Sequence, residues 1–422
     1  VYPQTGWGQV FADYFNDDII IENRAMGGRS SKSYDNDGRL DRILTEMHPG
    51  DYVFIQFGIN DGAENKPERY ISVEDYKKLI TDKYIGEVEK RGGTPVLMTA
   101  NAAAWWDEEN NCFMESRKDY ADPTREIAEE TGCKFIDENK IVTDAWNSMS
   151  KNRVLSGYFV CEPLESKAYP SGTNDTTHMK AKGAKRVAKL IADAIPENVP
   201  ELSKYLKGDE TFTDIQGHWA ENVIKTLAES DKISGVGDGK FNPDGTVTRA
   251  EFLKMAMDSL GIVGHAYRDG ECLDATNDDW YCYYLQGALD KDIIPEEMIE
   301  NCNVTKVTKT LAEATDDKKA VTTDVNVYTG KFDGDKPITR EEMAAIAVRC
   351  KNYKMRRLTD WDNERRYPIF SFKDSDEIDE KYISDVVKAY NLNYIDGMED
   401  GRFAPKENLT RAQAAVVMNN LK

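Results

Sequence analysis

The stretch that decides the fold of the N-terminal half is DYVFIQFGIND, residues 51–61. Its first seven residues form a near-continuous apolar run with many aromatic and β-branched side chains, which predicts a buried β-strand. The Gly, Asn and Asp that follow are residue types that end a strand in a turn. A strand with apolar side chains on both faces is typical of a parallel sheet covered by helices on both sides.

The sequence on either side of this strand repeats the same alternation. Further strands are predicted at 18–22 (DIIIE), 94–99 (TPVLMT) and 133–136 (CKFI), and helices at about 39–47, 73–91, 117–131 and 182–194. The alternation predicts a three-layer α/β domain over 1–198, with a parallel sheet between two layers of helices. Such sheets bind ligands beyond the carboxyl ends of their strands.

Length and charge exclude several classes of protein. A chain of 422 residues exceeds what one core usually accommodates, so two or more domains are expected. The net charge of -21 repels nucleic-acid phosphates and anionic lipid, so we expect neither as a partner. We expect no membrane insertion, because no stretch approaches the roughly 18 to 20 apolar residues that a membrane span needs.

Cysteine and histidine spacing gives no sign of a metal centre. The seven cysteines show no CxxC spacing, which argues against a zinc ribbon or a redox pair. An odd count leaves at least one thiol free, although a pair such as Cys272 with Cys302 stays open. There is also no Gly-rich phosphate loop, so we expect no cofactor and no metal.

The C-terminal half carries an internal repeat of three copies. In each copy an aromatic residue precedes an arginine by eight positions, and in the first and third copies it follows a Gly/Asp-rich turn: Phe241 and Arg249, Phe332 and Arg340, Phe403 and Arg411. After a linker at 199–210 we predict repeats at 211–262, 263–350 and 370–422, with a second linker at 351–369. The middle copy is altered: it begins near Tyr267-Arg268-Asp269 and carries an insertion at about 296–331. Each unit is too small to bury its own core, so three must pack together into a largely helical domain.

These residues resemble surface-layer homology (SLH) motifs. The resemblance implies attachment to secondary cell-wall polysaccharide at the bacterial surface, through an acidic group on the sugar. It places Arg249, Arg340 and Arg411 at the anion, since a guanidinium holds a carboxylate in two-pronged fashion. It also places Asp214, Trp219 and Asp374 on the sugar side. In the alternative interpretation the arginines pair with neighbouring glutamates, such as Glu251 or Glu341, and only hold the three copies together.

Three short segments of the N-terminal half carry residue types suited to ester chemistry. They are AMGGRSS at 25–31, FGIND at 57–61 and NDTTH at 174–178, all placed at strand ends or before the last helix. An aspartate three residues before a histidine lets one tight loop present both. Singly the motifs are weak, because Asn-Asp-Gly is a common turn and a histidine before a helix is more often a surface or capping residue.

Together with TGWGQ at 5–9, these segments resemble the SGNH hydrolases, specifically the rhamnogalacturonan acetylesterase branch with its flavodoxin-like fold. The resemblance implies that Asp175 orients His178 and that His178 acts as base and then as acid. The backbone N–H of Gly28 and the amide of Asn60 would stabilise the oxyanion.

The nucleophilic serine is expected ahead of Val1. In the family a Gly-Asp-Ser segment ends the first strand, before the stretch with which this sequence begins. We therefore expect the first strand and the serine to be missing and the domain to be inactive without them. Ser30, Ser31 and Ser33 match the second motif of the family, which follows the nucleophile segment, and we assign none of them as the nucleophile. No signal peptide is visible at Val1, which we interpret as a truncated start.

The expected function is that of a secreted, wall-anchored carboxylic ester hydrolase that removes O-acetyl groups from plant polysaccharide. Pectic rhamnogalacturonan and hemicellulose are both open as substrates, and Trp105, Trp106 and Tyr120 either line the sugar side of the cleft or pack in the core. The alternative is a noncatalytic surface-binding protein with a decayed esterase domain. A lipid or thioester substrate is a lesser alternative.

Overall fold

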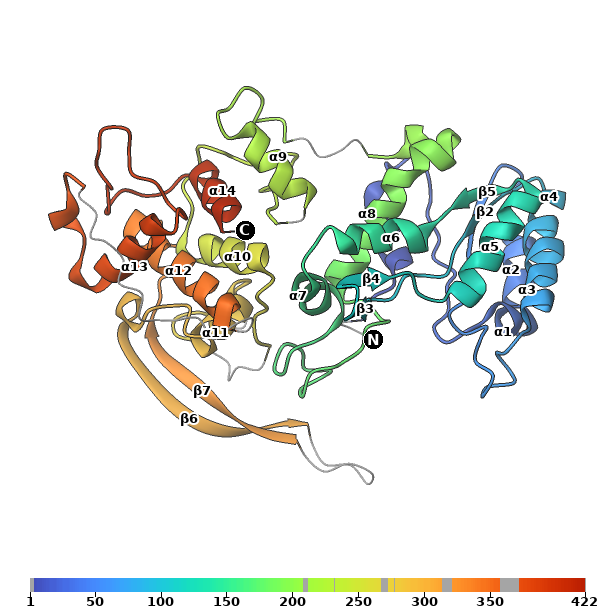
Figure 1. Cartoon of the computed structure of the whole chain (residues 1–422), viewed down its shortest axis with the longest axis horizontal. Helices are drawn as coiled ribbons and strands as arrows, with labels where there is room; N and C mark the ends of the chain where they lie inside the picture. The colour runs from blue at the N-terminus through green and yellow to red at the C-terminus, as the bar shows by residue number, and fades with distance from the viewer. Residues whose placement is uncertain are drawn as a thin grey trace. The chain divides into compact units, whose positions relative to one another are not determined.

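The computed structural model describes residues 4–207, 212–230, 232–266, 272–276, 278–312, 321–356 and 372–421 (Figure 1). Residue contacts divide the chain into two units. Unit 1 comprises 1–160 and 174–208, and unit 2 comprises 161–173 and 209–422. Each unit contains its own buried apolar cores.

The centre of unit 1 is a three-stranded parallel sheet in the order β1-β2-β5, with β1 at Tyr52–Gln56, β2 at Thr94–Met98 and β5 at Lys134–Ile136. Tyr52 pairs with Thr94 and Val96 pairs with Lys134, so the carboxyl ends of the strands share one edge. These are three of the four strands predicted from the sequence.

Alternate side chains of β2 enter two different cores, one on each face of the sheet. Val96 and Met98 pack with helices α6 (Glu138–Asn147) and α8 (Ala181–Asn198), whereas Leu97 packs with helices on the opposite face. Figure 1 shows these helical layers on either side of β2 and β5. The predicted three-layer α/β class is therefore confirmed.

The helices of unit 1 match most of the predicted ranges. The α-helices are α1 (Ser31–Asn36), α2 (Arg39–Glu46), α3 (Val73–Leu79), α4 (Gly86–Lys90), α5 (Lys118–Thr131), α6 (Glu138–Asn147), α7 (Lys151–Val154) and α8 (Ala181–Asn198). Single turns of 3-10 or π-helix are η1 (Trp7–Gln9), η2 (Phe11–Tyr14), η3 (Ile80–Ile85), η4 (Leu155–Phe159) and η5 (Pro200–Tyr205). A small hairpin joins β3 (Trp105–Asp107) to β4 (Cys112–Met114).

The predicted strand at 18–22 is wrong. This segment has turn and irregular backbone, although its side chains alternate as in a strand: Ile19 and Ile21 pack on the core and Ile20 is 85% exposed. Among the described residues no ladder of backbone hydrogen bonds joins it to a neighbouring strand. An apolar alternation without such a ladder does not make a strand.

The predicted linker at 199–210 is also wrong over its first part. Residues 200–205 form η5, Leu202 is buried in the core of unit 1, and the backbone N–H of Lys207 donates to the carbonyl oxygen of Tyr14. The relaxed apolar pattern there reflects a short 3-10 turn at the edge of a core rather than a linker.

Unit 2 is mostly helical and is built from three related copies. Its α-helices are α9 (Glu221–Glu229), α10 (Arg249–Leu260), α11 (Cys282–Asp290), α12 (Arg340–Arg356), α13 (Glu380–Asn391) and α14 (Arg411–Asn420), with 3-10 turns η6 (Glu296–Met298) and η7 (Ser375–Glu377). One continuous core contains Phe241, Phe332 and Phe403, the three aromatic residues of the repeat. A shared core of this kind means that no copy folds independently of the other two.

Backbone hydrogen bonds close the three copies into a ring. The N–H of Val247 donates to the carbonyl oxygen of Leu409 at 3.0 Å, that of Leu409 to Ile338 at 3.2 Å, and that of Ile338 to Val247 at 3.0 Å. Each of these residues lies two positions before the arginine that opens α10, α12 or α14. Because the ring returns to its first member, the copies stabilise one another cyclically.

An aspartate fixes the turn of each copy. Both carboxylate oxygens of Asp214, Asp274 and Asp374 accept backbone N–H groups from the aromatic residue of the same copy and the residue after it. Asp274 therefore marks the start of the middle copy. The predicted start at Tyr267-Arg268-Asp269 lies outside the described residues, and the sequence prediction missed Asp274 because Cys272-Leu273 replaces the aromatic residue that precedes the other two aspartates.

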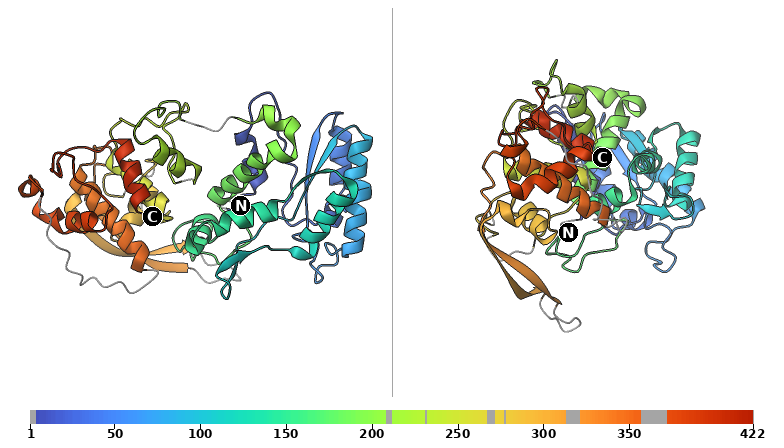
Figure 2. Two further views of the ribbon diagram at one scale, coloured as in Figure 1. Left: turned by 45° about the horizontal axis from the view of Figure 1, so that its top comes forward. Right: turned by 60° about the vertical axis from the view of Figure 1, so that its left-hand side comes forward.

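The insertion of the middle copy is a long antiparallel hairpin of β6 (Glu300–Ala312) and β7 (Val321–Lys331). Figures 1 and 2 show the hairpin extending from the helices of unit 2. At its base, Tyr328 is buried in the core and its carbonyl oxygen accepts from the N–H of Leu273. The insertion therefore replaces a loop without opening the ring.

The buried turn aspartate provides a stability test. Asp374→Asn removes a charged acceptor and turns an amide N–H toward one of the two donors, Phe403 and Ala404, so we expect a loss of about 2 to 3 kcal/mol. Urea denaturation measures the loss, and amide hydrogen exchange at 403–404 localises it. The exposed neighbour change Asp376→Asn is the control, expected within about 0.5 kcal/mol of the parent. Equal stability of both variants would contradict the assigned role.

Candidate functional sites

Asp175 and His178 lie on one tight loop and are hydrogen-bonded to each other. The Nδ1 atom of His178 lies 2.8 Å from Oδ2 of Asp175, and the backbone N–H groups of Thr177 and His178 both donate to Oδ1. The same carboxylate thus shapes the loop and orients the imidazole, as the spacing in the sequence predicts. His178 is 68% exposed at its side chain, so its other nitrogen faces solvent.

The carboxylate of Asp175 is held in its ionised form. Partial burial opposes ionisation, but the hydrogen bonds from His178 and Thr177 outweigh it and lower the pKa of Asp175. Gln4 also donates through Nε2 to Oδ2 at 2.9 Å, which ties the N-terminal segment to this loop. With Nδ1–H donated to Asp175, Nε2 is the atom that can accept a proton, and it makes no hydrogen bond to any residue in the part of the chain that the structure describes.

The loop lies at the carboxyl edge of the sheet. The N–H of Ala104, in the segment that follows β2, donates to the carbonyl oxygen of Thr176 at 2.8 Å. Further along the same edge, Gly58 follows β1 and approaches Ala100 so closely that a Cβ at Gly58 would lie 2.9 Å from the Ala100 Cβ. The segments that follow β1 and β2 and the Asp-His loop therefore meet at the edge where parallel sheets bind ligands.

Gly28 and Asn60, the predicted oxyanion donors, are brought together by a hydrogen bond. Asn60 donates through Nδ2 to the carbonyl oxygen of Arg29 at 3.1 Å, next to Gly28. Gly28 has a positive φ of 73°, which a residue with a side chain adopts only at a cost. No hydrogen bond among the described residues joins this pair to His178, so their joint action on one substrate stays a prediction.

Asp61 joins the two segments that carry Gly28 and Asn60. It is fully buried, and it accepts from the N–H of Ser31 at 2.8 Å and from the N–H of Gly58 at 2.9 Å. Burial raises the pKa of Asp61, and the hydrogen bonds from Ser31 and Gly58 oppose the rise. Asp61 belongs to the FGIND motif in the sequence, but only the structure shows that its carboxylate links the two segments by hydrogen bonds.

The serines beside Gly28 are used structurally. The Ser30 hydroxyl caps α1 by accepting from the N–H of Ser33, and the Ser33 hydroxyl accepts from the N–H of Ser30. The Ser31 hydroxyl donates to Asp61. All three are buried. Their hydroxyls are engaged in these local hydrogen bonds, so we assign none of the three serines as the nucleophile. The absence of the nucleophile from this chain stays a prediction.

The three aromatic residues suggested for sugar contact separate into two groups. Tyr120 is buried, and its hydroxyl donates to the carbonyl oxygens of Ile71 and Asp61, so it belongs to the core. Trp105 and Trp106 are half-buried in β3, directly after the segment that contacts Thr176. They remain candidates for the sugar side of the site.

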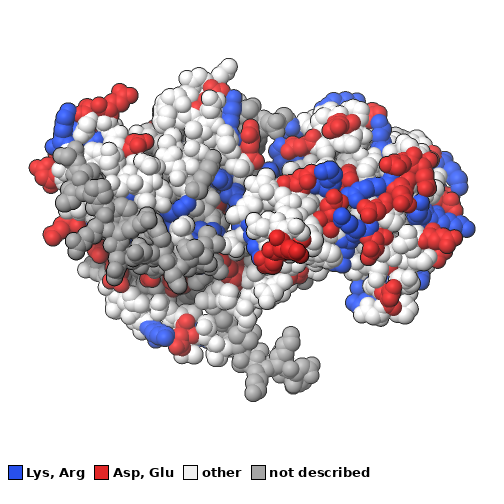
Figure 3. All heavy atoms as spheres, in the orientation of Figure 1, with Lys and Arg blue, Asp and Glu red and all other residues white. Residues whose placement is uncertain are grey.

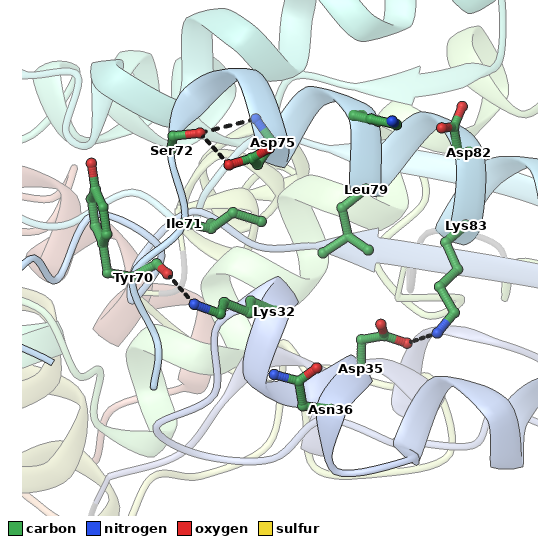
Figure 4. A pocket seen from close by; sticks show the side chains of 11 residues that line it. Lys32, Asp35, Asn36, Tyr70, Ile71, Ser72, Asp75, Leu79, Asp82 and Lys83 are labelled. Carbon is green, nitrogen blue, oxygen red and sulfur yellow. Dashed lines mark hydrogen bonds and ion pairs between the residues drawn. The ribbon is translucent and has the colours of Figure 1, made fainter. Parts of the chain in front are cut away.

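A surface cavity of about 610 Å³ lies elsewhere in unit 1, between α1 and α3 (Figure 4). Several of its polar groups are paired: Lys32 donates to the carbonyl oxygen of Tyr70, Ser72 bonds Asp75, and Lys83 forms an ion pair with Asp35. None of the predicted catalytic residues lines it. We therefore do not assign the reaction to this cavity.

The described residues give little sign of other kinds of site. Within the described ranges, no group of three or more His, Cys, Asp or Glu side chains is arranged to hold a metal ion. Among the described residues no disulfide bond joins two of the cysteines, Cys272 and Cys302 included. No helix in the part of the chain described has the length and apolar character to cross a bilayer.

In unit 2 the three arginines form what we call the arginine ring: Arg249, Arg340 and Arg411. Each is only 6–7% exposed and reaches into the next copy. Arg249 donates to the carbonyl oxygen of Phe332, Arg340 to that of Phe403, and Arg411 to that of Phe241. Each guanidinium also lies 4.8 to 5.9 Å from the centroid of the same phenylalanine ring. All three arginines therefore bridge neighbouring copies through a carbonyl oxygen.

The ring is not symmetric in charge. Arg249 forms a two-pronged ion pair with Glu342, and Arg411 contacts Glu251 at 3.5 Å. The third copy has Gln413 where the other two have these glutamates. In consequence Arg340 has no ion pair with a described carboxylate, and its Nη1 makes no hydrogen bond to a described residue.

The residues predicted on the sugar side differ in availability. Both oxygens of Asp214 and of Asp374 are engaged by backbone N–H groups, which gives these carboxylates a structural role instead. Trp219 is 66% exposed, and Trp280, in the similar place of the middle copy, is 52% exposed. Sequence reasoning missed Trp280, although its position shortly after Asp274 was a usable signal once Asp274 is aligned with Asp214.

The charge on the surface is mixed in sign on the face shown in Figure 3, where acidic side chains lie among basic ones over unit 1.

The parallel sheet with an Asp–His pair at its carboxyl edge defines unit 1 as a hydrolase-type α/β domain, and the closed ring of three copies defines unit 2 as a repeat domain. The chain belongs to the GDSL-like lipase/acylhydrolase family and is related to the rhamnogalacturonan acetylesterases, with S-layer homology domains in its C-terminal half.

Matches to known families and proteins show this relationship. The model of the GDSL-like lipase/acylhydrolase family matches residues 1–186, and the S-layer homology domain matches 211–253 and 371–415. The probable rhamnogalacturonan acetylesterase YesY of Bacillus subtilis (strain 168) is 34% identical over 194 residues, 46% of this chain and 84% of the relative. The rhamnogalacturonan acetylesterase RhgT of the same organism is 32% identical over 211 residues, 49% of this chain and 88% of the relative.

Among solved structures, the crystal structure of YxiM from Bacillus subtilis is similar, with a TM-score of 0.38 and 28% identity over 48% of this chain and 51% of that one. The family match agrees with a carboxylic ester hydrolase, and the S-layer homology domains indicate attachment to the cell surface.

The structural role of the arginine ring is tested by Arg249→Ala. The change leaves Glu342 buried without its cation, so we expect unit 2 to lose about 3 to 5 kcal/mol of stability. Urea denaturation followed by the fluorescence of the tryptophans measures this. Arg42→Ala removes an exposed i,i+4 ion pair with Glu46 and is the control, expected to cost at most about 0.5 kcal/mol. An unchanged denaturation midpoint for Arg249→Ala would mean that the ring does not hold the copies together.

Proposed function

We propose that this protein is a secreted carbohydrate esterase that removes O-acetyl groups from plant polysaccharide while unit 2 holds it to the bacterial cell wall. The observation that carries the enzymatic part is the Asp175–His178 pair at the carboxyl edge of the sheet. Support for the substrate comes from the relatives, two of which are named rhamnogalacturonan acetylesterases. Acetylated rhamnogalacturonan and acetylated hemicellulose are the two substrate classes considered.

In this proposal His178 takes the proton of the attacking hydroxyl at Nε2 and returns it to the departing sugar oxygen. Asp175 holds the Nδ1–H and stabilises the imidazolium that forms. The backbone N–H of Gly28 and the amide of Asn60 stabilise the oxyanion of the tetrahedral intermediate. The serine that attacks is proposed to lie ahead of Val1 in the complete protein.

The enzymatic proposal is tested by acetate release from acetylated polysaccharide, using the protein expressed from its complete reading frame. Asp175→Asn leaves the loop intact but removes the charge that holds the imidazole in the right tautomer, so we expect kcat to fall about 10⁴-fold. His178→Ala should have a similar effect, because the general base is lost. His48→Ala, a histidine away from the loop, is the control and should keep full activity.

The contrary outcome is informative as well. If the parent protein releases no acetate from any polysaccharide or small aryl ester, the esterase proposal is rejected. The S-layer homology domains would then carry the function, as in the alternative of a surface-binding protein with a decayed esterase domain.

For the anchoring part, we propose that Arg340 is the principal anion contact to acidic cell-wall polysaccharide. Arg249 and Arg411 are neutralised by Glu342 and Glu251, whereas Arg340 is buried with carbonyl partners only. Burial lowers the pKa of the Arg340 guanidinium, with Glu407 and other nearby carboxylates opposing this. A buried cation without a counterion gains most from an incoming anion. Trp219 and Trp280 are exposed aromatic surfaces on which a sugar ring can stack.

The change Gln413→Glu tests this assignment. It restores the carboxylate that the other two copies have, so it should neutralise Arg340 and weaken binding to purified wall fragments about tenfold without loss of stability. The matched control is Glu251→Gln, which removes a carboxylate from Arg411 and should leave binding equal or stronger. Sedimentation with wall fragments at several salt concentrations measures both. Undiminished binding by Gln413→Glu would remove Arg340 from the site.

A further inference from the structure

Arg117 is an arginine without a counterion among the described residues, next to the proposed catalytic loop. It lies at the start of α5 with a left-handed backbone, φ 58° and ψ 32°, which is strained for a residue with a side chain. Its preceding neighbour fixes this conformation: Ser116 accepts from the N–H of Ala103, and both its backbone N–H and its carbonyl oxygen are bonded by Asn139. The surrounding hydrogen bonds thus hold Arg117 in one place.

The guanidinium of Arg117 has an aromatic neighbour but no acidic one. Its central carbon lies 4.8 Å from the centroid of the Trp105 ring. Its Nε is enclosed and has no hydrogen-bond partner, and in the part of the chain that the structure describes no carboxylate forms an ion pair with this side chain. Burial lowers the pKa of Arg117. A half-buried cation in this state is stabilised by any anion that reaches it.

The contrast with Arg125 on the same helix shows that acidic partners are available in this chain. Arg125 forms ion pairs with Glu115, Asp122 and Asp137. The chain has 76 acidic residues against 55 lysines and arginines, so an arginine that pairs with none of the described carboxylates stands out. Because Nε is enclosed, the two terminal Nη atoms are the ones that can meet a ligand, which suits an end-on, two-pronged contact with a carboxylate.

The place of Arg117 connects it to the proposed ester site. Trp105, on which the guanidinium stacks, directly follows Ala104, whose N–H donates to Thr176 in the loop of Asp175 and His178. Tyr120, three residues after Arg117, packs against Gly58 in the segment that carries Asn60. Arg117 is therefore linked to both segments at the carboxyl edge of the sheet, to one through Trp105 and to the other through Tyr120.

We propose that Arg117 binds the carboxylate of an acidic sugar unit next to the acetylated one, with Trp105 as the platform that holds the guanidinium. This rests on the proposed esterase function and deepens it. The substrate class is an acetylated polysaccharide that contains uronic acid, rather than a neutral hemicellulose. Arg117 takes no part in the chemistry and sets specificity.

The test compares substrates with and without the carboxylate, again with the protein expressed from its complete reading frame. Arg117→Gln should lower kcat/KM on acetylated uronate-containing polysaccharide about tenfold to a hundredfold. It should leave kcat/KM on acetylated xylan and on a small neutral aryl acetate within about twofold. The loss should shrink at high salt, where the parent enzyme itself is weakened on the acidic substrate.

Two further variants show whether misfolding or a purely structural role of Arg117 explains a loss of activity in Arg117→Gln. Arg117→Gly removes the guanidinium and relieves the left-handed backbone, so it should keep the fold and lose the same selectivity. Arg117→Lys keeps the charge without the planar fork and should retain part of the selectivity. Arg91→Gln, which removes an exposed ion pair with Glu87, is the matched control and should not alter the substrate ratio.

The outcomes separate this inference from the proposed function. An equal loss on all three substrates, or no loss on the acidic one, overturns the role of Arg117 while acetate release by the parent still supports the esterase. If the parent releases no acetate at all, calorimetry with a de-esterified acidic oligosaccharide at low salt decides instead. Binding that falls about tenfold in Arg117→Gln supports the site, and equal binding by both proteins overturns it.

Discussion

Aspartates that accept backbone N–H groups fix five loops in the two units of this chain, among them the loop of Asp175 and His178. Asp61 joins the segments of Gly28 and Asn60, Asp175 shapes the loop of His178, and three further aspartates fix the turns of the repeats. In each case two donors from one or two segments converge on a single carboxylate, which is a stronger constraint than a neutral acceptor provides. The elements are positioned by apolar packing, but the loops between them are positioned by these charges.

This division explains which features the sequence predicts and which it does not. The strands at β1, β2 and β5 and the helices α2, α3, α5 and α8 follow from apolar periodicity, because each buries a continuous face. Periodicity failed at 18–22, where the side chains alternate but a hydrogen-bonding neighbour is absent among the described residues. It also missed α1, whose sequence SKSYDN is almost wholly polar and which is begun by the capping box of Ser30 and Ser33.

The candidate site was predictable where its residues are neighbours in the chain and not where they meet through tertiary contacts. The spacing of Asp175 and His178 alone places them on one loop, and the structure joins them as that spacing implies. Pairings across copies carry no such local signal: Arg249 with Glu342 and Arg411 with Glu251 join residues far apart in the sequence, and the sequence prediction considered the nearby Glu251 and Glu341 as partners. The asymmetry at Gln413 becomes visible only when the ring order is known.

Arg117 and Arg340 share one physical situation in two different units. Arg340 is buried and Arg117 is half-buried, both lie over an aromatic ring, and neither forms an ion pair with a described carboxylate. In a chain with a net charge of -21 carboxylates are abundant, and Arg125 on α5 and Arg349 on α12 both form ion pairs with them. A desolvated cation left without a counterion costs free energy that an anionic ligand recovers on binding. We therefore propose the same ligand chemistry for both positions, an acidic polysaccharide, as substrate at Arg117 and as anchor at Arg340.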